Sequence, residues 1–119
     1  MAQFRFQDMV IWQRAVEIGN RLLDIADDLE RRKLYRFADQ MRGAALSVSN
    51  NIAEGAGSDS NKEFAQFLNI AKRSCFEDAN MLIVFEQRGL IANRVRDELL
   101  AALEEESRKI QSFKRSLRE

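Results

Sequence analysis

Apolar side chains recur at steps of three and four residues in four successive segments, at about residues 9–29, 34–55, 60–88 and 94–117. An α-helix has about 3.6 residues per turn, so this spacing places the apolar residues of each segment on one helical face. Proline, which costs about 3 kcal/mol inside a helix, is absent from the 119 residues. The pattern predicts an all-α protein. Four helices joined by short turns favour an antiparallel up-and-down four-helix bundle, which we expect to form one domain over residues 1–119.

The expected turns carry residues that end and begin helices. Gly55 and Gly57 are expected to end the second helix by adopting positive φ angles. Ser60 and Glu63 have the spacing of a capping box at the start of the third helix. Gly89 is expected to end that helix.

The third segment is apolar over more than one helical face. Beside its core stripe it carries a second set of apolar residues, Ile70, Phe76, Met81, Ile83 and Val84. A helix that is apolar over much more than about 100° of arc is buried from more than one side. We expect this helix either to be central in the domain or to take part in a contact between copies. Trp12 is expected in the core, with a partly exposed anchor between copies as the alternative.

One side of the second helix carries small and polar groups instead of apolar ones: Gly43, Ser47, Asn50, Asn51 and Glu54. A buried polar group without a partner costs about 1–3 kcal/mol, so these groups are expected to be either solvated or bonded. Three interpretations stay open. The stripe is a solvated face, or a hydrogen-bonded network that fixes the turn and a neighbouring subunit, or a contact with a ligand or nucleic acid.

The residue types argue against catalysis and metal binding. Histidine is absent, which removes the commonest general base and metal ligand. Cys75 is the only cysteine, so a zinc cluster is excluded, and we expect it to be a small buried hydrophobe. Phosphate-binding glycine motifs are also missing. We therefore expect no enzymatic activity, no cofactor and no metal. The chain shows no signal-peptide pattern and no membrane-spanning run, so we expect a cytoplasmic protein.

Charge is balanced overall but locally clustered. Lys plus Arg and Asp plus Glu each number 19, which weakens the case for a whole-molecule electrostatic binder of nucleic acid. Basic residues gather near the first turn and near the C-terminus: Arg31, Arg32, Lys33, Arg36 and Arg42, then Arg108, Lys109, Lys114, Arg115 and Arg118. They are either ordinary solvated helix ends or phosphate contacts that a ring of copies would gather into a stronger field.

Several motifs resemble one known family. They are Trp-Gln-Arg-Ala at residues 12–15, Gln-Met-Arg at 40–42, Ser-Val-Ser-Asn-Asn-Ile-Ala-Glu-Gly at 47–55, and the third-segment pattern at 63–64, 67–68, 71–74 and 77. The chain resembles the four-helix-bundle proteins encoded by intervening sequences in bacterial 23S rRNA genes. Accessory variability proteins of diversity-generating retroelements are relatives of that family. The resemblance covers nearly the whole chain.

The resemblance implies a cytoplasmic up-and-down bundle that assembles into a ring, commonly a pentamer, with a role around RNA or ribonucleoprotein. The family's residues map onto Trp12, Gln13, Arg42, Asn51, Glu54, Gly55, Phe64 and Glu77. Ser47 and Phe76 complete our candidate set for an oligomer interface or structural motif. The chain departs from the family by carrying Gly43 and Ser58 at usually basic positions and Ser49 where proline is frequent.

The residue pattern and the family resemblance together lead us to expect one of two functions. The leading expectation is a non-enzymatic, homo-oligomeric scaffold or interaction protein associated with RNA or ribosomal components. The alternative is a nucleic-acid-binding protein that uses its basic helix ends.

Overall fold

The computed structural model describes residues 3–117, and every regular element in that range is a helix. The elements are a short 3-10 helix, η1 (Arg5–Asp8), and five α-helices, α1 (Val10–Arg31), α2 (Tyr35–Ala45), α3 (Ser47–Ala56), α4 (Asn61–Gln87) and α5 (Asn93–Ser116). The prediction of an all-α protein is therefore confirmed. The first, third and fourth predicted helices fall close to α1, α4 and α5.

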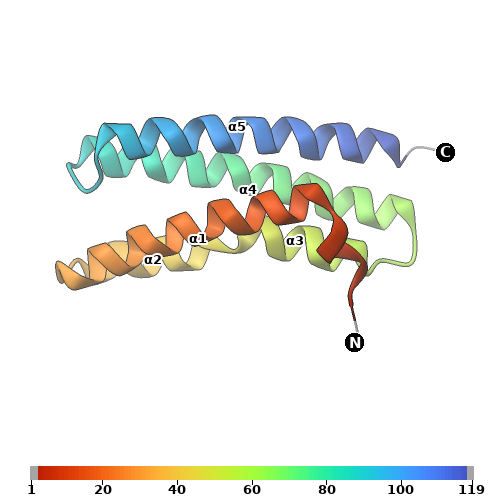
Figure 1. Cartoon of the computed structure of the whole chain (residues 1–119), viewed down its shortest axis with the longest axis horizontal. Coiled ribbons are helices and arrows are strands. Elements are labelled where there is room, and N and C mark those ends of the chain that lie inside the picture. Colours follow the sequence, from red (N-terminus) through yellow and green to blue (C-terminus); the bar gives the residue numbers. More distant parts are fainter. Residues whose placement is uncertain (1–2, 118–119) are drawn as a thin grey trace.

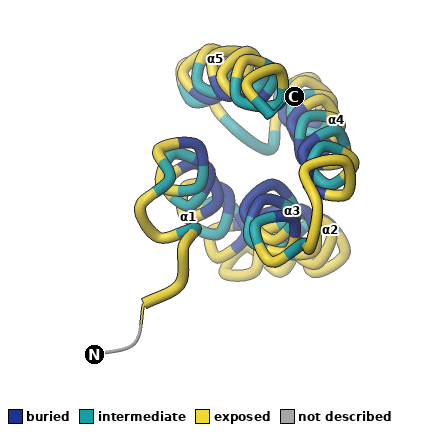
Figure 2. Tube along the Cα trace, turned by 90° about the vertical axis from the view of Figure 1, so that its right-hand side faces the viewer, coloured by how far each residue is buried: buried dark blue, intermediate teal, exposed yellow. Residues whose placement is uncertain are grey.

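The helices lie alongside one another in a bundle whose extents are 48 × 30 × 20 Å. Figure 1 shows that α2 and α3 follow one another in line and that the chain turns back after α1, after α3 and after α4. α1 packs against α2, α3 and α5, whereas α4 packs against α2, α3 and α5 from the other side. Within residues 3–117, α1 and α4 have no close backbone contact, so they lie diagonally across the bundle. Figure 2 shows the buried residues facing the common centre.

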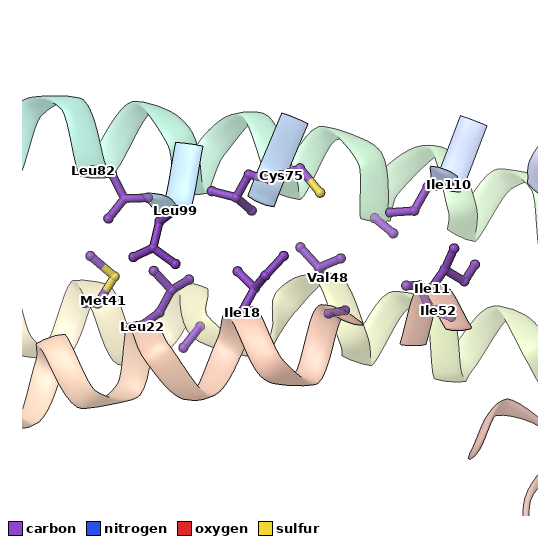
Figure 3. Close-up of a cluster of buried hydrophobic side chains, with 14 of the residues drawn as sticks. Ile11, Ile18, Leu22, Met41, Val48, Ile52, Cys75, Leu82, Leu99 and Ile110 are labelled. Carbon is purple, nitrogen blue, oxygen red and sulfur yellow. The ribbon is translucent and has the colours of Figure 1, made fainter. Parts of the chain in front are cut away.

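The core is built from one apolar stripe of each helix. In Figure 3, Leu22 of α1, Met41 of α2, Leu82 of α4 and Leu99 of α5 point toward one another, and none of them is more than 1% exposed. Burying a side chain of this size contributes about 1.5–3 kcal/mol, so such layers account for much of the stability. Cys75 is buried in the same core, as predicted.

The second predicted helix, residues 34–55, is two helices in the structure. The break falls at Leu46, which has φ −105° and ψ 4° between α2 and α3. There α1 comes unusually close, because a Cβ atom on Gly19 would lie 2.6 Å from the carbonyl oxygen of Ala45. The Ser49 hydroxyl donates to the Leu46 carbonyl at 3.2 Å, a local bond of the kind that competes with continuous helix. Because α2 and α3 stay in line, the apolar period continues through the break.

The turns bear out some capping predictions and correct others. Gly89 has φ +73° and follows the end of α4, with the Leu90 amide donating to the Phe85 carbonyl at 2.8 Å. The Ser60 hydroxyl accepts from the Glu63 amide at 3.1 Å and caps α4.

The expectation that Gly55 and Gly57 take positive φ angles is wrong. Gly57 is the C-cap of α3 with φ −87°, and Gly55 lies inside that helix. Gly55 is needed for space, because an added Cβ would lie 2.7 Å from the Phe67 Cβ and 2.8 Å from the Phe64 Cδ1. A non-glycine residue, Lys33, takes the left-handed conformation after α1, with φ 63°.

Candidate functional site

The outward face of α4 carries large apolar side chains that the chain does not cover. Phe76 is 66% exposed, and Ile70, Ile83 and Val84 are 44%, 39% and 40% exposed. Phe76 and Ile83 are seven residues apart, about two helical turns, so they lie on the same side of the helix. These are four of the residues that made α4 apolar over more than one face. The core accommodates only one stripe of α4, and the second stripe is left at the surface.

Two grooves flank this face of α4. The groove toward α2, of about 450 Å³, is lined by Glu77, Met81 and Val84 and by Gly43 from the opposite side. A Cβ atom on Gly43 would meet no atom within 4 Å, so this position is open. The groove toward α5, of about 300 Å³, includes Phe76. The predicted interface residues Phe76 and Glu77 are both exposed on α4, but they line different grooves, Phe76 toward α5 and Glu77 toward α2.

The polar stripe forms hydrogen bonds within the chain. The hydroxyl of Ser47 lies 2.8 Å from that of Ser74 and so joins α3 to α4, and Ser74 donates to the Ile70 carbonyl at 3.0 Å. The side-chain amide of Asn51 donates to the Ser47 carbonyl one turn earlier, at 2.8 Å. Glu54 is exposed and makes no side-chain hydrogen bond or ion pair with the described residues. The stripe thus ties α3 to α4 at Ser47 and leaves Glu54 available.

Trp12 and Gln13 lie on α1 and contact the N-terminal segment. Trp12 is half-buried, with its ring 5.0 Å from that of Phe6. Gln13 is exposed, and its side-chain amide donates to the carbonyl of Gln7 at 2.9 Å. Both residues hold the N-terminal segment against α1. Because α1 is diagonal to α4, the structure does not bring Trp12 or Gln13 together with Phe76.

The basic cluster at the first turn is largely neutralised. Arg42 donates to Asp27 at 2.9 Å and to Glu30 at 2.7 Å. These two bonds join α2 to α1 and raise the pKa of Arg42, with Asp27 the larger cause. Arg31 and Arg32 both pair with Asp28, at 3.8 and 3.0 Å. Lys33 and Arg36 are exposed, and neither pairs with a carboxylate of residues 3–117.

The C-terminal cluster divides in two. Arg108 pairs with Glu104 at 3.2 Å and Lys109 with Glu105 at 3.9 Å. Lys114 and Arg115, nearer the end of α5, form no ion pair within the described part of the chain. Arg118, also a predicted contact, lies outside the described residues. The sequence shows where basic residues gather, but only the folded chain shows which of them already have a carboxylate partner.

Two buried carboxyl groups are the main feature that the sequence analysis missed. Asp78 is 1% exposed, and neither of its carboxyl oxygens has a hydrogen-bond partner in the described structure. Burial, with a smaller effect of Glu77, raises the pKa of Asp78 to about 8. A signal existed, because Asp78 lies three residues after Cys75 and four before Leu82 on the core stripe.

Glu106 is the second buried carboxyl group. The run of three glutamates at residues 104–106 predicts an outer face for all of them, and the structure bears this out for Glu104 and Glu105 but not for Glu106. It is fully buried, and the Arg14 Nε donates to its Oε1 at 3.3 Å. Burial raises the pKa of Glu106 to about 7, although Arg14 acts in the opposite direction. Burial also raises the pKa of the Cys75 thiol to about 12, with smaller effects of Glu106 and Asp78. Within residues 3–117, no group of three such side chains is arranged to hold a metal ion.

These features define an all-α bundle protein with an uncovered apolar helix face, an interhelical polar contact at Ser47 and Ser74, and two buried carboxyl groups. The family model of the 23S rRNA-intervening sequence protein matches residues 7–112. The chain therefore belongs to that family, which confirms the resemblance drawn from its motifs. A comparison with curated proteins found no match. Among the described helices, none has the length and apolar character needed to cross a membrane.

Proposed function

We propose that the chain is a cytoplasmic, non-enzymatic scaffold or interaction protein whose four-helix bundles, up-and-down in topology, assemble into a homo-oligomeric ring. The observation that carries this proposal is the uncovered apolar face of α4, with Phe76 at its centre and 66% exposed. Exposed apolar patches mark interaction sites in soluble proteins. The four apolar side chains lie on the outward side of α4, with the exposed Arg73 and Asn80 among them. The partner that we propose is a second copy of the chain, which is available wherever the first copy is.

The balance of charge supports self-association. With 19 basic and 19 acidic residues, identical copies experience little net repulsion. Each Å² of apolar surface removed from water contributes about 25 cal/mol, so covering Ile70, Phe76, Ile83 and Val84 together stabilises a contact substantially. The groove beside Gly43 gives an incoming side chain room next to this face.

A ring requires two different surfaces on each copy, because a closed head-to-tail contact joins unlike patches. The α4 face supplies one of them. α1 is the helix diagonal to α4. Phe4, just before η1, is 69% exposed, and Val10, the first residue of α1, is 60% exposed. This pair is suited to be the second surface. The pentamer that the family resemblance implies would then repeat a contact between the α4 face of one copy and the N-terminal region of the next.

The proposal is tested by placing a charge at the centre of the α4 face. Phe76→Glu should leave the bundle folded, because Phe76 is already mostly exposed, and should shift the protein to single chains by native mass spectrometry. Asn20→Glu, at an exposed position on α1 that belongs to neither proposed surface, is the matched control and should keep the wild-type mass. Phe76→Leu should keep it as well, since an apolar side chain remains.

Unchanged assembly of a folded Phe76→Glu protein would show that the α4 face is not the contact. Equal disruption by Asn20→Glu would show that added negative charge, rather than the apolar face, determines the result.

A further inference from the structure

The start of α4 and the end of α5 lie side by side at one end of the molecule (Figure 1). A groove of about 340 Å³ lies between them. Lys62 and Ala65 of α4 line one wall, and Gln111, Lys114 and Arg115 of α5 line the other. None of the described residues that line the groove is a carboxylate. The groove therefore presents three cationic side chains and no anion of its own.

The three cations of this groove are not neutralised by their neighbours. Lys62, Lys114 and Arg115 form no ion pair with any carboxylate of residues 3–117, whereas the preceding basic residues of α5 are paired. The acidic residues nearest in sequence to Lys62 are Asp59 and Glu63, which are exposed and do not line the groove. Unpaired positive charge facing a concave surface attracts anions and concentrates them there.

Positive charge continues along α4 beyond the residues that line the groove. Lys72 lies ten residues after Lys62 on α4, about 15 Å along the helix at about 1.5 Å per residue. Its Nζ bonds to the Oε1 of Gln111 at 3.0 Å, which places the ammonium beside α5. An ammonium has three N–H donors, so further donors remain for a ligand. The cations thus form a row rather than a single anion pocket.

We propose that this basic groove, defined by Lys62, Lys72, Lys114 and Arg115, binds the phosphate backbone of a single-stranded nucleic acid. Grooves that follow a single strand combine positive charge with little sequence preference. A row of cations between two helices suits a flexible strand, because successive phosphates can be placed along it. The proposal uses none of the apolar residues of the α4 face, although Lys72 lies two residues after Ile70 on that helix.

The test is fluorescence anisotropy with a short labelled oligouridylate over a range of salt concentrations. The groove variant is Lys62→Glu combined with Lys114→Glu. The matched control is Lys33→Glu combined with Arg36→Glu, which changes the net charge equally at unpaired cations on the first turn. Circular dichroism and mass measurements establish that each variant is folded and assembled as the wild type is.

The wild type should bind, with affinity falling as salt rises. Each phosphate contact to a single strand contributes about 0.7 to the slope of log K against log salt. The groove variant should therefore lose about 1.4 from that slope, and at least about tenfold in affinity at low salt. The control should keep the wild-type slope. Unlabelled single-stranded DNA should compete, because the phosphates carry the interaction.

Three results would overturn the proposal. The wild type could fail to bind at low salt. The groove variant and its control could lose the same affinity, which would indicate net charge alone. Inorganic phosphate could compete as effectively as the strand at equal phosphate concentration, which would indicate a single-anion site. A single-chain Phe76→Glu protein that still binds the oligonucleotide would separate this site from the assembly proposal.

Discussion

Asp78 carries a charge-bearing side chain in an environment that disfavours charge. Its carboxyl group lies in the core without a hydrogen-bond partner among the described residues. A buried carboxylate without compensation is strongly disfavoured, so the group takes up a proton instead. Burial therefore raises the pKa of Asp78 from 3.8 to about 8. The folded chain therefore retains a proton that the unfolded chain releases.

The pH dependence of stability follows from that difference. Between about pH 4 and about pH 8 the folded state binds more protons than the unfolded state at Asp78, so the free energy of unfolding falls as pH rises. Above about pH 8 Asp78 is ionised in both the folded and the unfolded state. It then no longer contributes to the slope of the unfolding free energy against pH. Each unit between the two pKa values is worth about 1.4 kcal/mol, so the total reaches a few kcal/mol.

Asp78→Asn should remove the part of this dependence that Asp78 contributes and make the protein more stable than the wild type near pH 8. The amide has nearly the same shape and cannot ionise. Glu106, whose pKa is also raised by burial, to about 7, should keep a smaller slope of the same sign below about pH 7. Urea unfolding at several pH values and one fixed protein concentration measures the effect. Asp39→Asn, at an exposed position of α2, should leave the wild-type slope in place. A wild-type stability that stays flat from about pH 5 to pH 8 would contradict this account of Asp78.

At the scale of the helix, two glycines on consecutive helices have opposite roles. Gly55 allows α3 to press against Phe64 and Phe67 of α4, whereas Gly43 faces open space in α2. Gly55→Ala should destabilise the protein by about 1–3 kcal/mol through overpacking. Gly43→Ala should stabilise it by up to about 1 kcal/mol, because alanine is the better helix former. Thermal unfolding of the two variants checks the pair, and a stabilising Gly55→Ala would show that α3 and α4 are less tightly packed.

Helices were predictable because each buries one stripe, and the period of that stripe can be read from the sequence. The break at Leu46 was not predictable, since α2 and α3 remain in line and the apolar period continues through it. Gly55 looked like a helix terminator because its partners, Phe64 and Phe67, come from the next helix. Glu106 looked solvent-facing beside two other glutamates, although its distances of three from Leu103 and four from Ile110 place it on the core stripe.

The candidate site was predictable only in part, because the sequence does not show which residues of different helices come into contact. The second apolar stripe of α4 identified Phe76 as a surface residue of interest. The paired cations Arg42 and Arg108 cannot be told from the unpaired Lys114 and Arg115 by sequence, because pairing depends on neighbouring helices and turns. Basic composition alone therefore overstated the unpaired charge at the first turn, and it did not indicate that Lys62 lies beside Lys114 and Arg115.

At the scale of the whole molecule, the bundle covers one stripe of α4 and leaves the other in water. The assembly proposal holds that a second copy covers it, which would also bring the basic grooves of several copies into one particle. Repetition of a weak cationic site strengthens its field and allows one strand to contact several sites, with a gain in avidity when the spacing permits. Assembly and nucleic-acid binding would then reinforce each other while using different residues.

The most direct measurement is the molar mass of the purified wild-type chain by light scattering over a range of dilutions. The account predicts a stable multiple of the 13.8 kDa chain mass, five chains if the family expectation holds. A mass of one chain at all concentrations, with the α4 face in water, would contradict it.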